Sequence, residues 1–383
     1  MKVPFNKPPI CGGEIENIRT AISSGPLQGG GKFMGVCESL ISGFCAGRPS
    51  LLTNSCTASL EMAAMLCDIK PGDEIIVPTY TFVSTVSAFV LRGAKPVFCD
   101  IRADTLNIDE TKIEELITPK TRAIVPVHYA GVACEMDTIM DIAKRHNLLV
   151  VEDAAQGFFA FYKDKPLGSI GDLGSLSFHG TKNVVCGEGG ALIVNMETAP
   201  NRNVSATDRA NFIREKGTNR IHFLKGKIDK YTWVDLGSSY IPSELSAAFL
   251  AAQLPHTEEL TRKRVEAWNF YKEALAPLEK KGLIKTGCIP DSCRTNGHIF
   301  YIITESEKRT KELADFLAKR EISSNSHYVP LHTCPMTKQL GCPDVKLPVA
   351  EFSAKAMLRL PIHSYISKDE LEYVCESVEA GLK

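Results

Sequence analysis

The stretch that decides the fold covers residues 150–195 and reads VVEDAAQGFFAFYKDKPLGSIGDLGSLSFHGTKNVVCGEGGALIVN. It begins with an apolar strand that ends at Asp153, and it closes with apolar runs around Leu176 and Ile193. Strands that are apolar throughout, rather than alternating, are typical of a parallel sheet covered on both faces. A carboxylate at the end of such a strand is costly to bury without a partner, so Asp153 is either a helix cap or a functional group.

The same pattern extends toward the N-terminus. Between residues 50 and 195, short β-rich runs alternate with segments of helical pattern over 56–69, 80–92, 109–117 and 136–146. This βαβα rhythm predicts an α/β fold with a mostly parallel sheet and helices on both faces. In such sheets the chemistry lies at the carboxyl ends of the strands. The polar residues expected there are Asp100, His128, Asp153 and Gln156.

The pattern changes in the C-terminal part of the chain. Residues 200–235 are polar and irregular, which indicates an excursion from the sheet. A long helical segment follows from Pro242 to about Leu275, and Pro277 is expected to stop it. From Gly282 onward, short strands and helices suggest a smaller α+β unit. We therefore predict a large domain over 1–258 and a small C-terminal domain over 259–383.

Composition excludes several classes of protein. The 383 residues carry 44 Lys plus Arg and 45 Asp plus Glu, a net charge of −1, so a nucleic-acid partner is not expected. The 13 cysteines include no CxxC pair, so we expect reduced thiols and no metal site. The N-terminus has prolines where a signal peptide needs an apolar run, and no apolar run reaches 18 residues. These features favour a cytoplasmic protein without a membrane segment.

Several residues match the needs of a pyridoxal 5'-phosphate (PLP) enzyme. Such an enzyme needs a lysine for the aldehyde and a carboxylate for the pyridine nitrogen, and Lys182 and Asp153 are the candidates. It also needs hydroxyls at a helix N-terminus for the phosphate. Thr57, which opens a helix after a strand, and Ser177 could supply them. Phe82 could cover the ring. Each residue also has an ordinary explanation, as a surface lysine, a helix start, a strand serine or a core aromatic.

The motifs VEDAAQ (151–156), SFHGTKN (177–183) and GEGGA (187–191) carry a family resemblance, supported by PTYTFVST (78–85) and PVHYAG (126–131). Together they resemble the DegT/DnrJ/StrS sugar aminotransferases over nearly the whole chain, from PFNKPPI to LRLPIH. The resemblance implies the fold-type I architecture of PLP-dependent aminotransferases. It also implies a homodimer whose active sites are each completed by the partner chain.

Position by position, the resemblance implies a role for each matching residue. Lys182 would anchor the cofactor and move the proton, and Asp153 would pair with the pyridine nitrogen. Gln156 would contact the phenolic oxygen of the ring, and Phe82 would cover its face. The phosphate would be held by Thr57, Ala58 and Ser177.

Two further positions are implied less directly. Many relatives have a Phe-Asn-Tyr-Arg segment whose Asn reaches the phosphate of the neighbouring subunit. Here the segment reads Ser-Ser-Tyr-Ile over 238–241, so Ser239 would replace the Asn and the Arg is missing. His327, in HYVPLH, matches a position that often faces the sugar.

The resemblance also implies a reaction. Stretches such as SCTASLEMA (55–63) and DKYTWVDLGSSY (229–240) are most like those of family members that make dTDP-4-amino-4,6-dideoxygalactose for enterobacterial common antigen. The expected donor is L-glutamate, and the expected acceptor is a dTDP-4-keto-6-deoxy sugar used for cell-surface polysaccharide. The resemblance does not decide which nucleotide the sugar carries, which configuration the sugar has, or whether C4 or C3 receives the amino group.

Three other functions are alternatives for this chain. A dehydratase on this scaffold has histidine in place of the lysine, and position 182 is Lys. A non-catalytic sensor would bind the cofactor or a sugar nucleotide without turnover. A simple amino-acid aminotransferase would act without any sugar.

Overall fold

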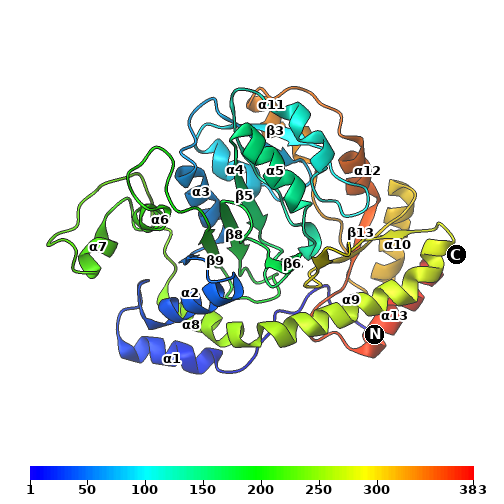
Figure 1. Ribbon diagram of the computed structural model, residues 1–383. Helices are drawn as coiled ribbons and strands as arrows, with labels where there is room; N and C mark the ends of the chain where they lie inside the picture. Colours follow the sequence, from blue (N-terminus) through cyan, green and yellow to red (C-terminus); the bar gives the residue numbers. More distant parts are fainter.

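A seven-stranded sheet forms the centre of the molecule (Figure 1). The computed structural model describes residues 1–383. The strand order is β1-β9-β8-β5-β4-β2-β3. The strands are β1 (Ser50–Thr53), β2 (Glu74–Pro78), β3 (Lys95–Cys99), β4 (Thr121–Ile124), β5 (Leu149–Ala154), β8 (Leu173–Ser177) and β9 (Gly190–Val194). All neighbouring pairs from β8 to β3 are parallel, and only β9 runs antiparallel to both of its neighbours. The predicted mostly parallel α/β sheet is confirmed.

Helices cover both faces of this sheet because successive residues of each strand point to opposite sides. Val150 belongs to one buried cluster and Val151 to the other, and the same alternation separates Ile193 from Leu192. One face packs against α2 (Lys32–Phe44), α5 (Met136–His146) and α8 (Glu244–Gln253), and the other against α3 (Cys56–Leu66), α4 (Ser84–Val90) and α6 (Ala206–Arg214). The outermost helix, α1 (Glu14–Ser24), packs on α8.

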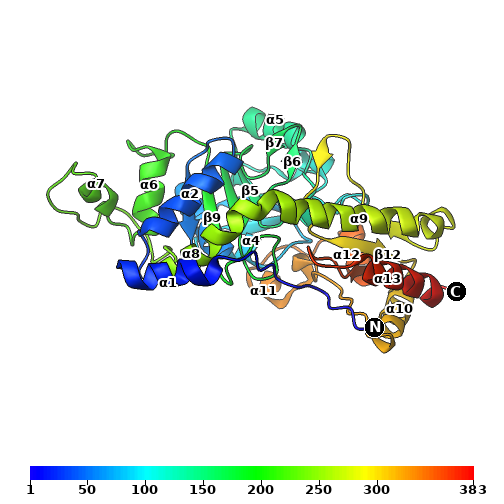
Figure 2. The ribbon, with the colours of Figure 1, turned by 90° about the horizontal axis from the view of Figure 1, so that it is seen from below.

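A smaller unit lies at the far end of the long helix α9 (Thr257–Lys280), which runs along one side of the molecule (Figure 2). Its antiparallel sheet has the order β10-β12-β13, with β10 (Lys285–Thr286), β12 (Phe300–Ile303) and β13 (Met357–Leu360). Around it lie α10 (Glu307–Lys319), α12 (Pro348–Ala356) and α13 (Lys368–Gly381), whereas the short α11 (Pro335–Gln339) lies near β3 of the large sheet. The N-terminal segment also belongs here, because Val3 pairs with Ile322 and is buried in this unit's core. The division at residue 258 stays a prediction.

Three expected helices differ from the structure. Residues 109–117 form two short 3-10 turns rather than an α-helix, because β4 begins at Thr121 and so short a helix is marginal. The helix expected over 80–92 begins only at Ser84, because Thr79 bonds His332 and residues 79–81 form a bend between β2 and the helix. Pro277 does not stop α9, which continues to Lys280. The buried Leu278 holds this last turn in the small domain's core.

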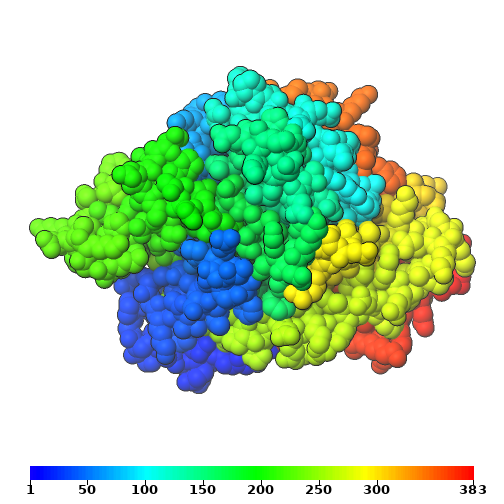
Figure 3. Space-filling view, in the orientation of Figure 1, coloured from blue at the N-terminus to red at the C-terminus, as the bar shows by residue number.

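The polar excursion contains α6, which packs against α3, and the short α7 (Arg220–Leu224), which has no buried residue and projects beyond the body of the molecule (Figure 3). Its largest exposed apolar side chain is Trp233, at 73% exposure. A small third sheet is formed by β11 (Cys293–Arg294), which pairs with β6 (Phe161–Tyr162), and by β7 (Lys165–Pro166), which pairs with β6 on its other side.

None of the helices combines the length and the apolar character that crossing a bilayer requires.

Candidate active site

A cavity of about 720 Å³ opens at the carboxyl ends of the parallel strands, between the large sheet and β13. Seven of the nine predicted site residues line it: Thr57, Phe82, Asp153, Gln156, Ser177, Lys182 and His327. They come from five separate stretches of the sequence and from both domains. The sequence motifs therefore converge on one cavity.

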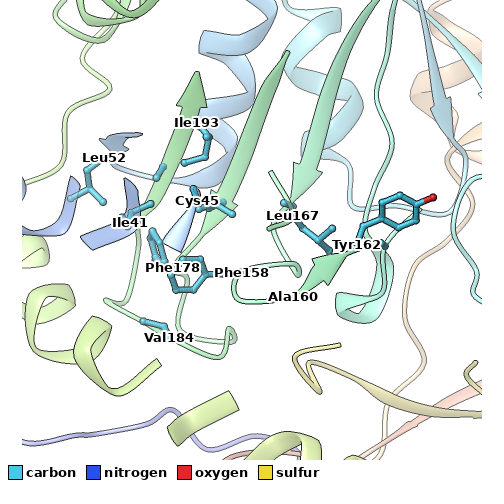
Figure 4. Close-up of a cluster of buried hydrophobic side chains, with 14 of the residues drawn as sticks. Ile41, Cys45, Leu52, Phe158, Ala160, Tyr162, Leu167, Phe178, Val184 and Ile193 are labelled. Atoms are coloured by element: carbon cyan, nitrogen blue, oxygen red, sulfur yellow. The ribbon is translucent and has the colours of Figure 1, made fainter. Parts of the chain in front are cut away.

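Lys182 lies in a turn that the apolar core holds at both ends. Phe178 before the turn and Val184 after it are buried in the cluster of Figure 4, where Phe178 meets Phe158 edge to face. Within the turn, the Lys182 N–H donates to the carbonyl of His179 at 2.9 Å. The backbone of this loop is therefore fixed, and only the lysine side chain is free to move in the cavity.

The ammonium of Lys182 has few favourable neighbours. Burial lowers the pKa of Lys182, and the charge of Arg359 lowers it further, whereas Cys56 and Asp153 act in the opposite direction. No salt bridge engages this lysine. A depressed pKa makes the neutral amine more accessible, and a neutral amine is the form that attacks a carbonyl or accepts a proton.

Asp153 is a buried carboxylate without a cationic partner in the chain. It is 4% exposed, and it accepts the hydroxyl of Thr85 at Oδ2 (2.7 Å) and the N–H of Ala155 at Oδ1 (3.0 Å). Each carboxylate oxygen can accept a further hydrogen bond. The site therefore has capacity for one protonated nitrogen facing Asp153, and burial makes such a pairing favourable.

Gln156 is held in one orientation by two partners. Its Oε1 accepts the N–H of Ala130 (2.7 Å), and its Nε2 donates to the hydroxyl of Tyr328 (2.9 Å). The second hydrogen of Nε2 remains available to an oxygen in the cavity. Phe82 also lines the cavity and is 55% exposed, with its ring 6.3 Å from that of Tyr328. An aromatic face open to the cavity suits a flat ligand ring.

Hydroxyl and N–H groups gather at the start of α3. Thr57 Oγ1 lies 2.8 Å from Ser84 Oγ, and Ser177 lines the same cavity. The N–H groups of Cys56 and Thr57 donate to no group of the chain, and α3 has eleven residues whose dipole favours an anion here. This end of the cavity fits a phosphate.

Glycine lets α3 come this close to the sheet. A Cβ on Gly190, the first residue of β9, would lie 2.4 Å from the backbone nitrogen of Cys56. Of the GEGG turn, only Gly187 has a positive φ (83°). The motif therefore allows a left-handed backbone conformation at Gly187 and close packing of α3 against β9 at Gly190.

His327 is oriented by Tyr129, whose hydroxyl lies 2.7 Å from Nδ1. Burial lowers the pKa of His327 to about 2, and it raises the pKa of Tyr129 well above its usual value. Both groups are therefore neutral, and the phenol donates to Nδ1. The ring's own proton then sits on Nε2, from which it can be donated to a ligand oxygen.

Two predicted residues lie apart from the cavity. The Ala58 N–H donates to Ser55 Oγ (3.0 Å) as the cap of α3, so it is already bonded. Ser239 is exposed on the outer surface, where only its carbonyl is engaged, by Asn54 at 3.2 Å. Of the other strand-end residues, Asp100 accepts the first N–H groups of α12, and His128 bonds Glu152 behind the site.

Sequence reasoning missed several lining or supporting residues. They are Ser84, Thr85, Tyr129, Arg264, His298, Tyr328 and Arg359. Ser84 and Thr85 lie within the quoted PTYTFVST motif, whose hydroxyl content was a usable signal. Tyr129 follows the strand-end residue His128 in PVHYAG, and Tyr328 follows His327 in HYVPLH, so both stood next to residues already singled out. Arg264, His298 and Arg359 lie in segments without a strand-end or turn pattern.

The residues present fit PLP. Lys182 would hold its aldehyde, Asp153 would face its ring nitrogen, and Thr57, Ser84 and Ser177 would hold its phosphate. A buried carboxylate without a cationic partner suits the ring nitrogen of this cofactor, and the hydroxyl and N–H donors at the start of α3 suit its phosphate. When bound, PLP supplies the electron sink for amino transfer.

Comparison with known proteins agrees with this geometry. Residues 10–379 match the model of the DegT/DnrJ/EryC1/StrS aminotransferase family. The chain therefore belongs to that family, and its class is that of the PLP-dependent sugar aminotransferases.

Individual relatives cover the whole chain. The spore coat polysaccharide biosynthesis protein SpsC of Bacillus subtilis is 32% identical and covers 100% of this chain and 97% of its own length. GDP-perosamine synthase of Caulobacter vibrioides is 30% identical, with 100% and 98% covered. Among solved structures, the PMP form of the Streptococcus pneumoniae protein Spr1654, described as a sugar aminotransferase, has a TM-score of 0.90 at 26% identity, with 100% and 99% covered. The fold-type I prediction is confirmed.

Proposed function

We propose that the protein transfers the amino group of L-glutamate to the C4 ketone of a dTDP-linked 4-keto-6-deoxy sugar. The product is a dTDP-4-amino-4,6-dideoxy sugar of galacto configuration for cell-surface polysaccharide. The observation that carries amino transfer is the pairing of an accessible, weakly basic Lys182 with the unpaired carboxylate of Asp153 in one cavity. The lysine also argues against the dehydratase alternative.

Each residue would have a defined role. Lys182 would hold the aldehyde of the cofactor and, as a neutral amine, would take the proton from the donor's α-carbon and deliver it to the cofactor, which supplies the electron sink. Asp153 holds the ring nitrogen protonated. His327 donates its Nε2 hydrogen to an oxygen of the sugar. Because both substrates use the same cavity in turn, the kinetics are expected to be ping-pong.

We also propose a homodimer with shared active sites. Ser239 lies outside its own chain's cavity, and the neighbouring excursion exposes large apolar side chains that a partner would cover. These are Phe223, Leu224, Tyr231, Trp233, Val234 and Leu236. Light scattering should report twice the mass of 41.9 kDa. Trp233→Ser should shift the protein toward the monomer, and a wild-type monomer would refute the proposal.

The acceptor is tested with matched substrates. The purified protein is incubated with PLP, L-glutamate and either a dTDP-linked or a GDP-linked 4-keto-6-deoxy sugar, and the products are identified by mass spectrometry and NMR. The GDP-linked sugar is included because two relatives are GDP-perosamine synthases. An axial 4-amino group on the dTDP product is the expected result. Preference for the GDP sugar, or an equatorial amine, would overturn the assignment of the acceptor.

A further inference from the structure

His298, in the segment before β12, lines the cavity, and its neighbours fix which ring nitrogen carries the hydrogen. Asn183 donates from Nδ2 to the carbonyl of Asn296 (2.9 Å), so the atom of Asn183 that lies 2.8 Å from His298 Nδ1 is the acceptor Oδ1. Nδ1 is therefore the donor of this pair. Burial lowers the pKa of His298 well below its usual value, so the ring is neutral and Nε2 carries a lone pair.

The backbone holds the ring of His298 in place. Its N–H donates to Oδ1 of Asn296 (3.1 Å), and its carbonyl accepts from Nη2 of Arg264 (2.8 Å). Asn296 in turn donates to the carbonyls of Gln156 and Phe158, both at 2.8 Å. No N–H or O–H group of the chain donates to Nε2, so a fixed ring presents an unused acceptor.

The titratable side chains that act on His298 all carry N–H groups, and none is a carboxylate. They are Lys182 in its turn, Arg264 on α9, His327 in HYVPLH and Arg359 on β13. Of these, Lys182 lowers the pKa of His298 most. Lys182 and His298 also share a second, small cavity of about 10 Å³ with Ser177 and Asn183. A cavity of this size takes one water molecule or the end of a lysine side chain.

The amine of Lys182 has no better acceptor in the cavity. It donates to no group of the chain and forms no salt bridge. Asp153 already accepts two hydrogen bonds and would face the ring nitrogen of the cofactor. Glu188 is turned to solvent, with 72% of its side chain exposed. Burial raises the pKa of the Cys56 thiol, which leaves a weak acceptor. Nε2 of His298 is the acceptor that remains.

We propose that His298 is a positioning residue for Lys182: its Nε2 accepts one hydrogen of the lysine amine whenever that amine is free of the cofactor, and so fixes the direction of the amine's own lone pair for proton transfer. This inference rests on the proposed function. A lysine amine on its flexible four-carbon stem samples many orientations, and one hydrogen bond to a fixed ring selects among them. The same bond is stronger when the amine is protonated, so His298 also raises the proton affinity of Lys182.

The first test uses the full-length, cofactor-free protein and needs no turnover. The pKa of Lys182 is measured by trace labelling with acetic anhydride over a range of pH, with the labelled peptide quantified by mass spectrometry. His298→Asn keeps a donor near Nδ1 for Asn183 but has no atom at Nε2, so it should lower the proton affinity of Lys182 about tenfold. His298→Gln places an amide oxygen near Nε2 and should stay close to the wild type.

These two variants rank in the opposite order if His298 serves only to hold Asn183, and that order would overturn the proposal. An unchanged pKa of Lys182 in His298→Asn would overturn it as well. The matched control is His363→Asn, at a histidine of the small domain that is 2% exposed and does not line the cavity. This control should leave the pKa of Lys182 as in the wild type.

The second test follows the half-reaction of the PLP-loaded protein with L-glutamate that carries hydrogen or deuterium on its α-carbon. His298→Asn should slow this step by on the order of tenfold and keep or increase its isotope effect, because the proton transfer itself is impaired. A slower step with a smaller isotope effect would assign His298 to binding, and slowing of the sugar step alone would assign Nε2 to a sugar hydroxyl. Either result overturns the proposal. A wild-type protein that fails with glutamate, while the pKa of Lys182 still depends on His298, refutes the proposed function instead.

Discussion

Thr85 donates its hydroxyl hydrogen to Oδ2 of Asp153 at 2.7 Å, from the first turn of α4 to the end of β5. Thr85 is fully buried, and its oxygen lies 2.8 Å from the hydroxyl of Thr81. The two threonines therefore form a short chain of hydroxyls that ends on the carboxylate. This chain fixes one oxygen of Asp153.

Removal of this hydroxyl should slow the reaction while the cofactor stays bound. Thr85→Val keeps the shape of the side chain but leaves Oδ2 without its donor, so we expect a loss of about 1–3 kcal/mol in stability and roughly tenfold in half-reaction rate. Thr85→Ser, which restores the hydroxyl, should recover most of both. The rates are followed by stopped-flow absorbance with L-glutamate. Asp153→Asn should be much slower than Thr85→Val, and near-normal rates for Asp153→Asn would contradict the role given to this carboxylate.

The packing of Gly190 against α3 predicts an effect on cofactor affinity. Gly190→Ala places a methyl 2.4 Å from the Cys56 nitrogen, so the start of α3 must shift and its N–H groups lose their alignment with the phosphate. We expect PLP to bind at least about tenfold more weakly, which equilibrium dialysis would measure.

Gly187→Ala is the matched control for Gly190→Ala. Gly187 has a positive φ of 83° but open space around its Cβ, so this variant should lose about 1 kcal/mol of stability and keep its affinity for PLP. The packing account would be wrong if both variants bound PLP with the same affinity.

Glu152, the neighbour of Asp153 on β5, supports the site from behind. This fully buried carboxylate accepts from His128 Nε2 (2.9 Å) and from the backbone N–H groups of Gly168, Ile170 and Gly171 (2.7–2.9 Å). The Cys134 N–H donates to the other ring nitrogen of His128, which places the histidine's proton toward Glu152. Four hydrogen-bond donors on one carboxylate satisfy its acceptors without a lysine or arginine partner.

Glu152→Gln should therefore destabilise the protein strongly. The amide nitrogen of glutamine cannot accept, so buried donors lose their partner at a cost of roughly 2–5 kcal/mol in the free energy of unfolding. Urea denaturation measures this cost. Glu188→Gln, at a side chain that is 72% exposed, should change stability by no more than about 0.5 kcal/mol. Equal midpoints for the two variants would contradict the supporting role of Glu152.

The depressed pKa of Lys182 predicts a pH dependence of stability. In the cofactor-free protein the unfolded chain holds the lysine's proton more tightly than the folded one, so folding is disfavoured at low and neutral pH. This penalty disappears as pH rises through the folded pKa toward the ordinary lysine value of about 10.4. Lys182→Met should therefore stabilise the cofactor-free protein at pH 7, and the difference from wild type should shrink toward pH 10. A difference that stays constant with pH would contradict the assignment.

The sequence allowed the fold and the large-domain half of the site to be predicted. Asp153 and Ser177 end apolar strands, and Lys182 follows in a glycine-rich turn, so local pattern alone brings them to one edge of a parallel sheet. The pairing of Gln156 with Tyr328 joins residues 172 positions apart, and that of Tyr129 with His327 joins residues 198 apart. No local periodicity encodes such contacts, because they depend on how the two domains pack.

Errors in the expected helices have the same physical origin. The pattern over 80–92 is helical, but Thr79 is held by a small-domain histidine, so tertiary contact overrides local propensity. A single arginine in a short strand has no distinctive pattern, so the sequence does not mark Arg359 of β13 as a residue that lines the cavity.

The central claim is tested most directly by the absorbance spectrum of the PLP-loaded protein, recorded on adding L-glutamate and then dTDP-4-keto-6-deoxyglucose. We predict that the visible band of the lysine-bound cofactor disappears with glutamate and returns with the sugar, and that Lys182→Ala shows neither the band nor turnover above about 10⁻³ of wild type. A band that glutamate does not change would contradict aminotransferase activity, and a normally active Lys182→Ala protein would contradict the site.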